Sequence, residues 1–260
     1  TARAEDGGGL GSGPGRARAA GGETEAGDPL GGLPTRFVLR PLTLPAGILR
    51  IDLAGAVGAA DEGRGIDATA EARAGFGLGV SDRFEVGASL LRPSTSGGAV
   101  ALSLAPDVEL LDPGLYGMLR LFRGTTELAV RLEAYAPVTS ERFRLLLGVP
   151  IRVHGGDVLR IDSGVFLETD FGPLGDGIVP LLLAAQLSDT VFVLGEVTVR
   201  FPDPEVAVEV GLGTTLAGVG ETPLGDLELS YRLRDAQDPA GDFAVWIRAS
   251  LYLRLFGPAS

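Results

Sequence analysis

Strict alternation of apolar and polar residues is the feature that most constrains the fold of this chain. In the stretch FAVWIRASLYLRLF, residues 243–256, the odd-numbered positions are all apolar, and Trp246, Arg248, Tyr252 and Arg254 stand among the even-numbered ones. A period of two places successive side chains on opposite faces of a β-strand, whereas an amphipathic helix needs a period near 3.6. The two arginines therefore share one face of a strand whose other face is apolar.

The same alternation recurs from residue 48 to residue 256, in segments of about ten residues separated by Gly, Asp, Pro and Ser. It predicts twelve strands, at residues 48–58, 66–80, 83–91, 115–123, 126–137, 142–153, 158–168, 178–187, 190–201, 205–216, 225–234 and 243–256. Short and long connections alternate along most of this series. An even strand number with short turns at one rim and longer loops at the other is typical of outer-membrane barrels. We therefore predict an all-β fold, a single antiparallel up-and-down transmembrane β-barrel of about 12 strands with both termini periplasmic.

The chain divides around this barrel into four parts. Residues 1–35 are predicted to be a disordered Gly/Ala-rich tail, 36–47 a proline-broken extended approach segment, 48–256 the transmembrane barrel and 257–260 a C-terminal overhang. No apolar run reaches the roughly 20 residues of a transmembrane helix. The first residues lack the apolar core of a signal peptide, so an exported chain is expected to be in its mature form here.

The two faces of the predicted strands differ in charge. The polar face carries arginines and acids in equal numbers, while the apolar face is built from Leu, Val, Ala, Ile and Phe. If the apolar face pointed inward, a twelve-stranded barrel would enclose a wide void that side chains of this size do not fill. We therefore expect lipid outside and water inside, in preference to a large soluble all-β fold. The aromatic residues expected near strand ends on the lipid face are Phe76, Phe84, Phe143, Phe201, Tyr231 and Phe243.

Charged residues at the alternate strand positions that face inward, which we call the inward parity, are the candidate pore-lining residues. They are Arg73, Glu85, Arg120, Arg131, Glu133, Arg144, Arg160, Asp162, Glu196, Arg200, Glu209, Glu228, Arg232 and Arg248. Opposite charges inside a barrel create a transverse field and define a constriction. The alternative is that they pair with each other and only fill the interior. The apolar segment 99–111 is expected to fold into the mouth as a constriction, hairpin or lid.

Three stretches carry a resemblance to a known family: LPAGILRIDLAG (44–55), GVSDRFEVGASL (79–90) and DPGLYGMLRLFRGTTELAVRLEAYAPV (112–138). They resemble the outer-membrane channel family named after the meta-pathway of phenol degradation. The resemblance implies a channel or transporter for small solutes, apolar ones included, and it brings no catalytic residues. The last strand also resembles the signal read by the outer-membrane assembly machinery, although GPAS follows Phe256. The expected partners are thus the lipid bilayer, that machinery and a small-molecule solute.

Enzymatic chemistry finds little support. His154 is the sole histidine and stands in the predicted turn VHGGD. A serine hydrolase needs a serine and an orienting polar group within hydrogen-bond reach, and Ser163 and Ser89 are the candidates on the polar face. Neither lies in a recognisable nucleophile motif. We therefore predict a turn histidine, no catalytic residues and no enzyme.

Metal and nucleic-acid functions are also not expected. The chain has no Cys, and its acidic loop clusters lack the ligand order of a calcium hand. These clusters are Asp107, Glu109 and Asp112, and Asp235, Asp238 and Asp242. A net charge of −12 argues against a nucleic-acid partner. We predict no metal, no cofactor and passive passage of small solutes across the outer membrane; the alternatives are a structural or assembly-linked barrel without conductance and a barrel-embedded lipid hydrolase.

Overall fold

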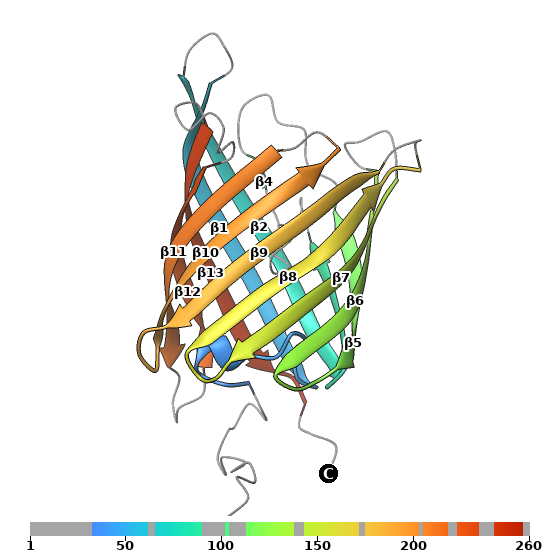
Figure 1. Cartoon of the computed structure of the whole chain (residues 1–260), viewed down its shortest axis with the longest axis vertical. Coiled ribbons are helices and arrows are strands. Elements are labelled where there is room, and N and C mark those ends of the chain that lie inside the picture. The colour runs from blue at the N-terminus through green and yellow to red at the C-terminus, as the bar shows by residue number, and fades with distance from the viewer. Residues whose placement is uncertain are drawn as a thin grey trace, which may run out of the picture.

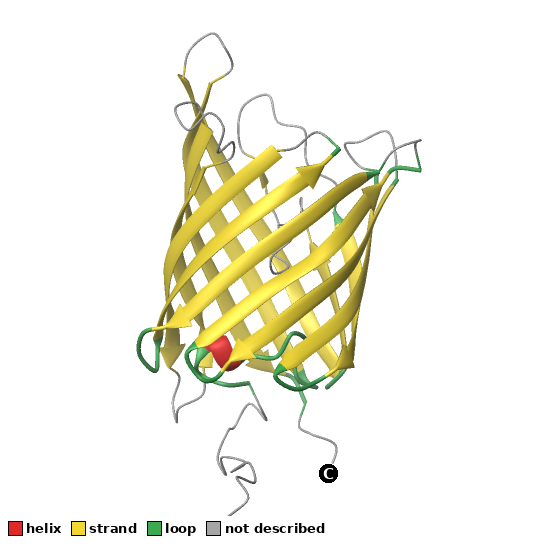
Figure 2. Cartoon of the chain, in the orientation of Figure 1, coloured by secondary structure: helices red, strands yellow, loops and turns green. Residues whose placement is uncertain are grey.

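A computed structural model describes residues 33–61, 66–89, 102–103, 113–137, 143–171, 175–202, 205–217, 223–233 and 242–256. These residues form strands, apart from the short 3-10 helix η1 (Phe37–Leu39) and the connections (Figures 1 and 2). The strands are β1 (Ile48–Asp61), β2 (Ile66–Ser81), β3 (Phe84–Ser89), β4 (Leu102–Ser103), β5 (Gly114–Phe122), β6 (Thr126–Tyr135), β7 (Arg144–Gly155), β8 (Leu159–Thr169), β9 (Asp176–Gln186), β10 (Val191–Phe201), β11 (Glu205–Ala217), β12 (Pro223–Leu233) and β13 (Asp242–Arg254).

The wall is a closed antiparallel barrel. Each strand pairs with its neighbours in chain order, and β1 closes the ring because Leu49 lies opposite both Leu253 of β13 and Leu78 of β2. Of the strands in the described residues, twelve form this wall, and the two-residue β4 adds to β2 beyond the end of the short β3. The predicted fold class is confirmed, and the predicted strand ends differ from the observed ones by at most three residues.

The two rims of the barrel differ. The tight connections at 82–83, 123–125, 156–158 and 187–190 lie at one rim together with η1, and we call it the turn rim (Figure 1). The opposite rim, which we call the loop rim, contains the other ends of the strands, among them Asp61, Tyr135 and Thr169. The predicted lid at 99–111 falls outside the described residues apart from β4. No helix in the part of the chain that the structure describes is long and apolar enough to span a bilayer.

Apolar side chains face outward and polar ones inward, as the alternation predicts. The exposed fractions are 69% for Leu115 and 52% for Leu132, whereas Tyr116 and Glu133, the next residues along the same strands, are 4% and 0% exposed. A closed barrel satisfies its backbone hydrogen bonds within the wall, so this apolar exterior is suited to hydrocarbon. Phe76, Phe84, Phe143, Phe201 and Tyr231 are exposed there, whereas Trp246 is fully buried inside.

The lumen has an apolar side, formed by inward residues of β7 to β10. These are Leu146, Phe166, Ile178, Leu182, Phe192 and Leu194. On β9 the residues of both faces are apolar, so alternation alone does not show which face points into the lumen. Two of the rings lie flat over glycines of neighbouring strands: a Cβ added at Gly148 would come within 2.1 Å of the Phe166 ring. Glycine is required there by the close approach of the ring.

The N-terminal segment enters the lumen at the turn rim, where it includes η1 (Figure 1). We call residues 33–47 the plug segment. Val38 and Thr43 are fully buried, and Gly47 has a φ of +79° where the segment turns into β1. The sequence predicted an extended approach over 36–47; that prediction is wrong for 37–39, because these residues form a 3-10 turn with buried partners on the barrel wall.

Candidate functional site: the lumen and its plug segment

The first half of the plug segment is held by hydrogen bonds to its backbone. Arg160 of β8 donates to the carbonyl oxygen of Phe37 at 2.9 Å. The amide nitrogen of Val38 donates to Oε1 of Gln186 at 3.3 Å, and its carbonyl oxygen lies 2.8 Å from Nδ1 of His154. Side chains of β7, β8 and β9 thus replace the hydrogen-bond partners that a longer helix would supply within itself.

Arg152 of β7 holds the next residues. It donates to the carbonyl oxygens of Arg40 at 2.9 Å and of Pro41 at 2.6 Å, while it pairs with Asp162 at 2.7 Å. Asp162 also pairs with Arg160 at 3.2 Å. Two guanidinium groups therefore share one carboxylate, and plug-segment carbonyls accept their remaining hydrogen bonds.

Carboxylates on β6 and β3 bind the amides that follow. The backbone N–H of Leu42 donates to Glu127 at 2.5 Å, and that of Leu44 donates to Glu85 at 2.8 Å. Glu85 also accepts the hydroxyl of Tyr116 at 2.7 Å. Hydrogen bonds to ionised groups are stronger than neutral ones, so these contacts extend the docking of the segment along the wall from β7 to β3.

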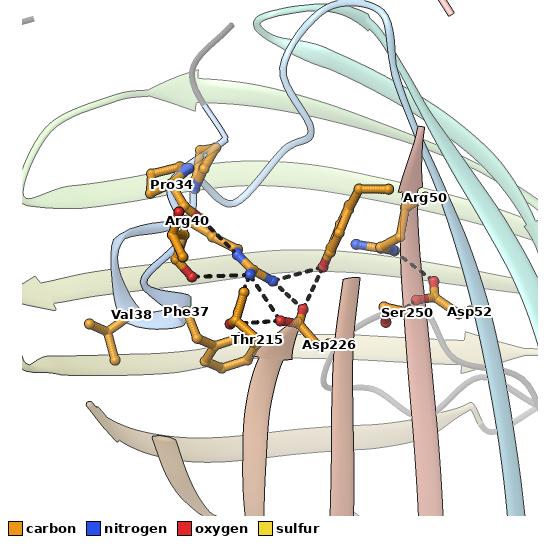
Figure 3. Close-up of polar contacts among 12 residues, drawn as sticks. Pro34, Phe37, Val38, Arg40, Arg50, Asp52, Thr215, Asp226 and Ser250 are labelled. Carbon is orange, nitrogen blue, oxygen red and sulfur yellow. Dashed lines mark hydrogen bonds and ion pairs between the residues drawn. The ribbon is translucent and has the colours of Figure 1, made fainter. Parts of the chain in front are cut away.

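The side chain of Arg40 is the most heavily bonded group of the plug segment (Figure 3). It forms a bidentate ion pair with Asp226 of β12, and the second of its two bonds measures 2.9 Å. It also donates to the hydroxyl groups of Tyr252 at 2.9 Å and Thr215 at 3.2 Å. Arg40 is only 4% exposed, so its charge is compensated inside the barrel.

Phe37 inserts its ring between two wall residues. Its ring stacks on that of Phe192 with the centroids 4.0 Å apart and an interplanar angle of 7°. On the other side the guanidinium carbon of Arg160 lies 3.9 Å from the centroid of Phe37. A ring between an aromatic face and a guanidinium gains both stacking and cation–π energy.

At the turn rim the plug segment makes exposed ion pairs. Arg36 donates to Asp189 at 2.6 Å and to Asp157 at 2.9 Å. The hydrogen bonds that Arg36 donates to Asp189 raise the pKa of the guanidinium. These pairs are solvent-exposed, so we expect them to contribute little to docking.

Above the plug segment the lumen contains a cavity of about 210 Å³. Its lining includes apolar residues of the plug segment and of β8 to β10, among them Leu44, Phe166 and Leu194. Charged residues also line it, among them Arg131, Arg160 and Arg248. The cavity is therefore amphipathic.

Ion pairs join most of the charged side chains of the lumen. Arg248 of β13 bonds Glu209 of β11 and Glu228 of β12, and it donates to Ser230 at 2.8 Å. Arg131 of β6 bonds Glu133 at 2.7 Å. Cross-strand and same-strand pairing of this kind matches the expected balance of charge on the inward parity.

The predicted pore-lining residues fall on the inward parity of their strands. Seven are buried: Glu85, Arg120, Arg131, Glu133, Arg160, Asp162 and Glu209. Six are half-buried: Arg144, Glu196, Arg200, Glu228, Arg232 and Arg248. Arg73 of β2 lies opposite Ala54 of β1, and the side chain of Arg73 is not among those that the structure describes. That these residues line a conducting path stays a prediction.

Sequence reasoning missed the plug segment as part of the site. Phe37 and Arg40 lie in a stretch without alternation, so no periodic signal marks them as lumenal. Their partners Asp226 and Tyr252 do lie on the inward parity, and alternation alone was enough to find that orientation. What it could not show is which side chain each of them meets.

The structure does not assemble a hydrolase site from His154 and Ser163. Ser163 was predicted on the polar face, but it lies on the outward parity between Ile161 and Val165, and its hydroxyl donates to the carbonyl oxygen of Pro180 at 2.9 Å. His154 faces inward, and the side chain of Ser89 is outside the described residues. Among the residues described here, no group of three His, Cys, Asp or Glu side chains could hold a metal ion.

Solved structures of outer-membrane channels have a similar fold. An outer-membrane channel from Pseudomonas putida F1 superposes with a TM-score of 0.54 at 12% identity, over 81% of this chain and 97% of the channel. The KdgM porin superposes with a TM-score of 0.54 at 6% identity, over 77% and 98%, and its complex with a disordered oligogalacturonate gives 0.55 at 7%, over 78% and 98%. The chain has the fold of outer-membrane channels.

The closed wall and apolar exterior suit a bilayer, so this molecule is an outer-membrane β-barrel of the porin-like type. No family model matches the sequence, and no curated protein matches it. Membership of the family named after the meta-pathway of phenol degradation therefore stays a prediction.

Proposed function

We propose that this protein is a non-enzymatic channel that passes small solutes passively across the outer membrane, with the plug segment as its closed gate. The observation that carries the proposal is the amphipathic cavity directly above the plug segment. A channel must bind its solute well enough to admit it and weakly enough to release it. A lining that combines apolar residues with paired charges suits small solutes with an apolar body.

The family resemblance supports the same function. The stretches at 44–55, 79–90 and 112–138 resemble outer-membrane channels of the phenol meta-pathway family, and we propose membership on that ground. The bilayer and the outer-membrane assembly machinery are the proposed partners, because the exterior is apolar and the last strand resembles the assembly signal.

The competing function is a structural barrel without conductance. The plug segment and the ion-paired lumen favour it, because both fill space that a solute would need. The distinction requires a variant with a weakened plug, and Arg40→Met removes its main side-chain anchor.

Purified full-length protein in planar bilayers tests the proposal. We expect discrete conductance steps from the wild type and larger or more frequent steps from Arg40→Met. If both proteins stay silent over many confirmed insertions, the channel proposal falls and the structural barrel stands. Heat-modifiable migration on a detergent gel confirms that each sample is folded.

A further inference from the structure

The slot that holds the ring of Phe37 is built from the barrel wall. We call Phe192 and Arg160 the ring slot, since the Phe37 ring lies between them at centroid distances of 4.0 Å and 3.9 Å. Phe192 is fully buried and Arg160 is 4% exposed. The Phe192 ring also lies close to Gly213, where an added Cβ would come within 2.2 Å of it. The slot is therefore a preformed surface for a flat ring, and the chain fills it with a residue of its own.

Among the described residues, the guanidinium groups beside the ring slot form direct ion pairs with one carboxylate only. Arg152 and Arg160 share the single carboxylate of Asp162. Their other hydrogen bonds go to the carbonyl oxygens of Phe37, Arg40 and Pro41. Nε of Arg160 has no hydrogen-bond partner among the described residues. Neutral carbonyls of the plug segment thus occupy positions in which an anion would bind more strongly.

From this arrangement we propose that the lumen binds a monocyclic aromatic carboxylate in the place of Phe37. The ring lies between Phe192 and Arg160, and the carboxylate accepts hydrogen bonds from Arg152 and Arg160. The adjoining cavity of about 210 Å³ gives the ligand access, and a cavity of roughly 150 Å³ is enough for benzene. The proposal deepens the channel function and names its solute class.

The ring and the carboxylate of the ligand each match a different part of the site. A neutral aromatic molecule would leave the guanidinium donors without acceptors once the plug-segment carbonyls move away, and unmet buried donors are costly. An aliphatic acid would satisfy the donors but would not stack on Phe192. A cation would meet the positive excess of Arg152 and Arg160. Only the combination of ring and carboxylate replaces what the plug segment supplies.

Accessibility of position 38 tests the proposal. The chain has no cysteine, so Val38→Cys places a single thiol at a fully buried position next to Phe37. The full-length variant in detergent micelles is treated with a maleimide, with and without benzoate. A ligand that binds only when Phe37 has left raises the open population by a factor of 1 + [L]/Kd, which is about tenfold at roughly ten times Kd. We expect labelling to accelerate accordingly.

Three controls define the ligand class. Benzyl alcohol keeps the ring without the charge, and cyclohexanecarboxylate keeps the charge without the aromatic ring; neither should accelerate labelling at the same concentration. Ser188→Cys, at an exposed turn, should label at one rate throughout. No effect of benzoate, or an equal effect of either analogue, overturns the proposal.

Wall variants locate the effect. Phe192→Leu and Arg152→Gln, each combined with Val38→Cys, should reduce the ratio of labelling rates with and without benzoate to near one, even where the basal rate rises. A ratio that stays near ten in both variants overturns the ring slot as the site. Because labelling is measured without a membrane, it is independent of conductance. Conductance without a benzoate effect removes this inference alone, whereas a benzoate effect on a silent barrel removes the channel function alone.

Discussion

The guanidinium of Arg40 and the carboxylate of Asp226 form a bidentate ion pair inside the barrel, where their side chains are only 5% and 9% exposed. The pair joins the N-terminal segment to β12, 186 positions away in the chain. Removing one partner of a buried pair costs about 3–5 kcal/mol, because the other charge stays buried without compensation. If Arg40 is replaced and the segment leaves the lumen, water reaches Asp226, so this cost is avoided.

Arg40→Met is therefore expected to shift the plug segment out of the lumen and not to unfold the barrel. Single-channel recording should show larger mean conductance or longer open times than in the wild type. The matched control is Arg36→Met, which removes only exposed ion pairs at the turn rim. An unchanged conductance in Arg40→Met, with the wild type active, would show that the segment does not limit passage.

The ion cluster around Arg248 gives a prediction on selectivity. Arg248→Gln leaves Glu209 and Glu228 without their shared cation, so the lumen becomes more negative. The reversal potential in a salt gradient should move toward cation selectivity, and Glu228→Gln should move it the other way. Arg83→Gln, at an exposed turn, should leave it unchanged. Equal shifts in all three variants would mean that these residues do not line the path.

The outward face gives a prediction on stability. Val165 lies near the middle of β8 and is 64% exposed on the outer surface. Val165→Arg should destabilise the barrel in lipid by about 2–4 kcal/mol, the cost of an arginine near the bilayer midplane. Val158→Arg, in the turn before the same strand, should cost roughly 0–1 kcal/mol. Urea titration of both variants refolded in vesicles measures the difference, and equal costs would contradict the outward orientation of Val165.

The ring over Gly148 gives a prediction on packing. A Cβ at this position would lie 2.1 Å from the Phe166 ring, so Gly148→Ala must displace the ring and should destabilise the barrel by about 1–3 kcal/mol. At Gly195 the nearest atom is 4.0 Å away, so Gly195→Ala should be neutral or slightly stabilising. The temperature of the shift between folded and unfolded bands on detergent gels compares the two. A drop that is the same for both substitutions would rule out the ring contact as the cause.

Much of the fold could be predicted because β-strand alternation is a local signal. Leu251 and Tyr252 differ in burial because adjacent side chains must point to opposite faces, and no knowledge of distant residues is needed for that. The same rule placed thirteen of the fourteen candidate lumenal residues on the inward parity where the structure describes their side chains. Strand ends were less certain, since a strand ends where its pairing partner ends.

The plug segment could not be predicted for the opposite reason. The contacts of Phe37 and Arg40 join positions more than 100 residues apart in the chain, and no pattern around them indicates a partner. The wrong orientation of Ser163 has a different origin: a serine reads as polar, but its hydroxyl bonds the carbonyl of Pro180 within the wall and tolerates an outward position. The apolar lumenal side was hidden because β9 is apolar on both parities.

The contacts of Arg40 have a consequence for biogenesis. Thr215, Asp226 and Tyr252 belong to β11, β12 and β13, which follow the other strands of the barrel in the chain, whereas Arg40 precedes all of them. Its docking place therefore does not exist until the final hairpin has joined the sheet. The barrel must pass through a stage in which its wall is nearly complete but the plug segment is not yet docked. Formation of the Arg40 contacts marks the end of that stage.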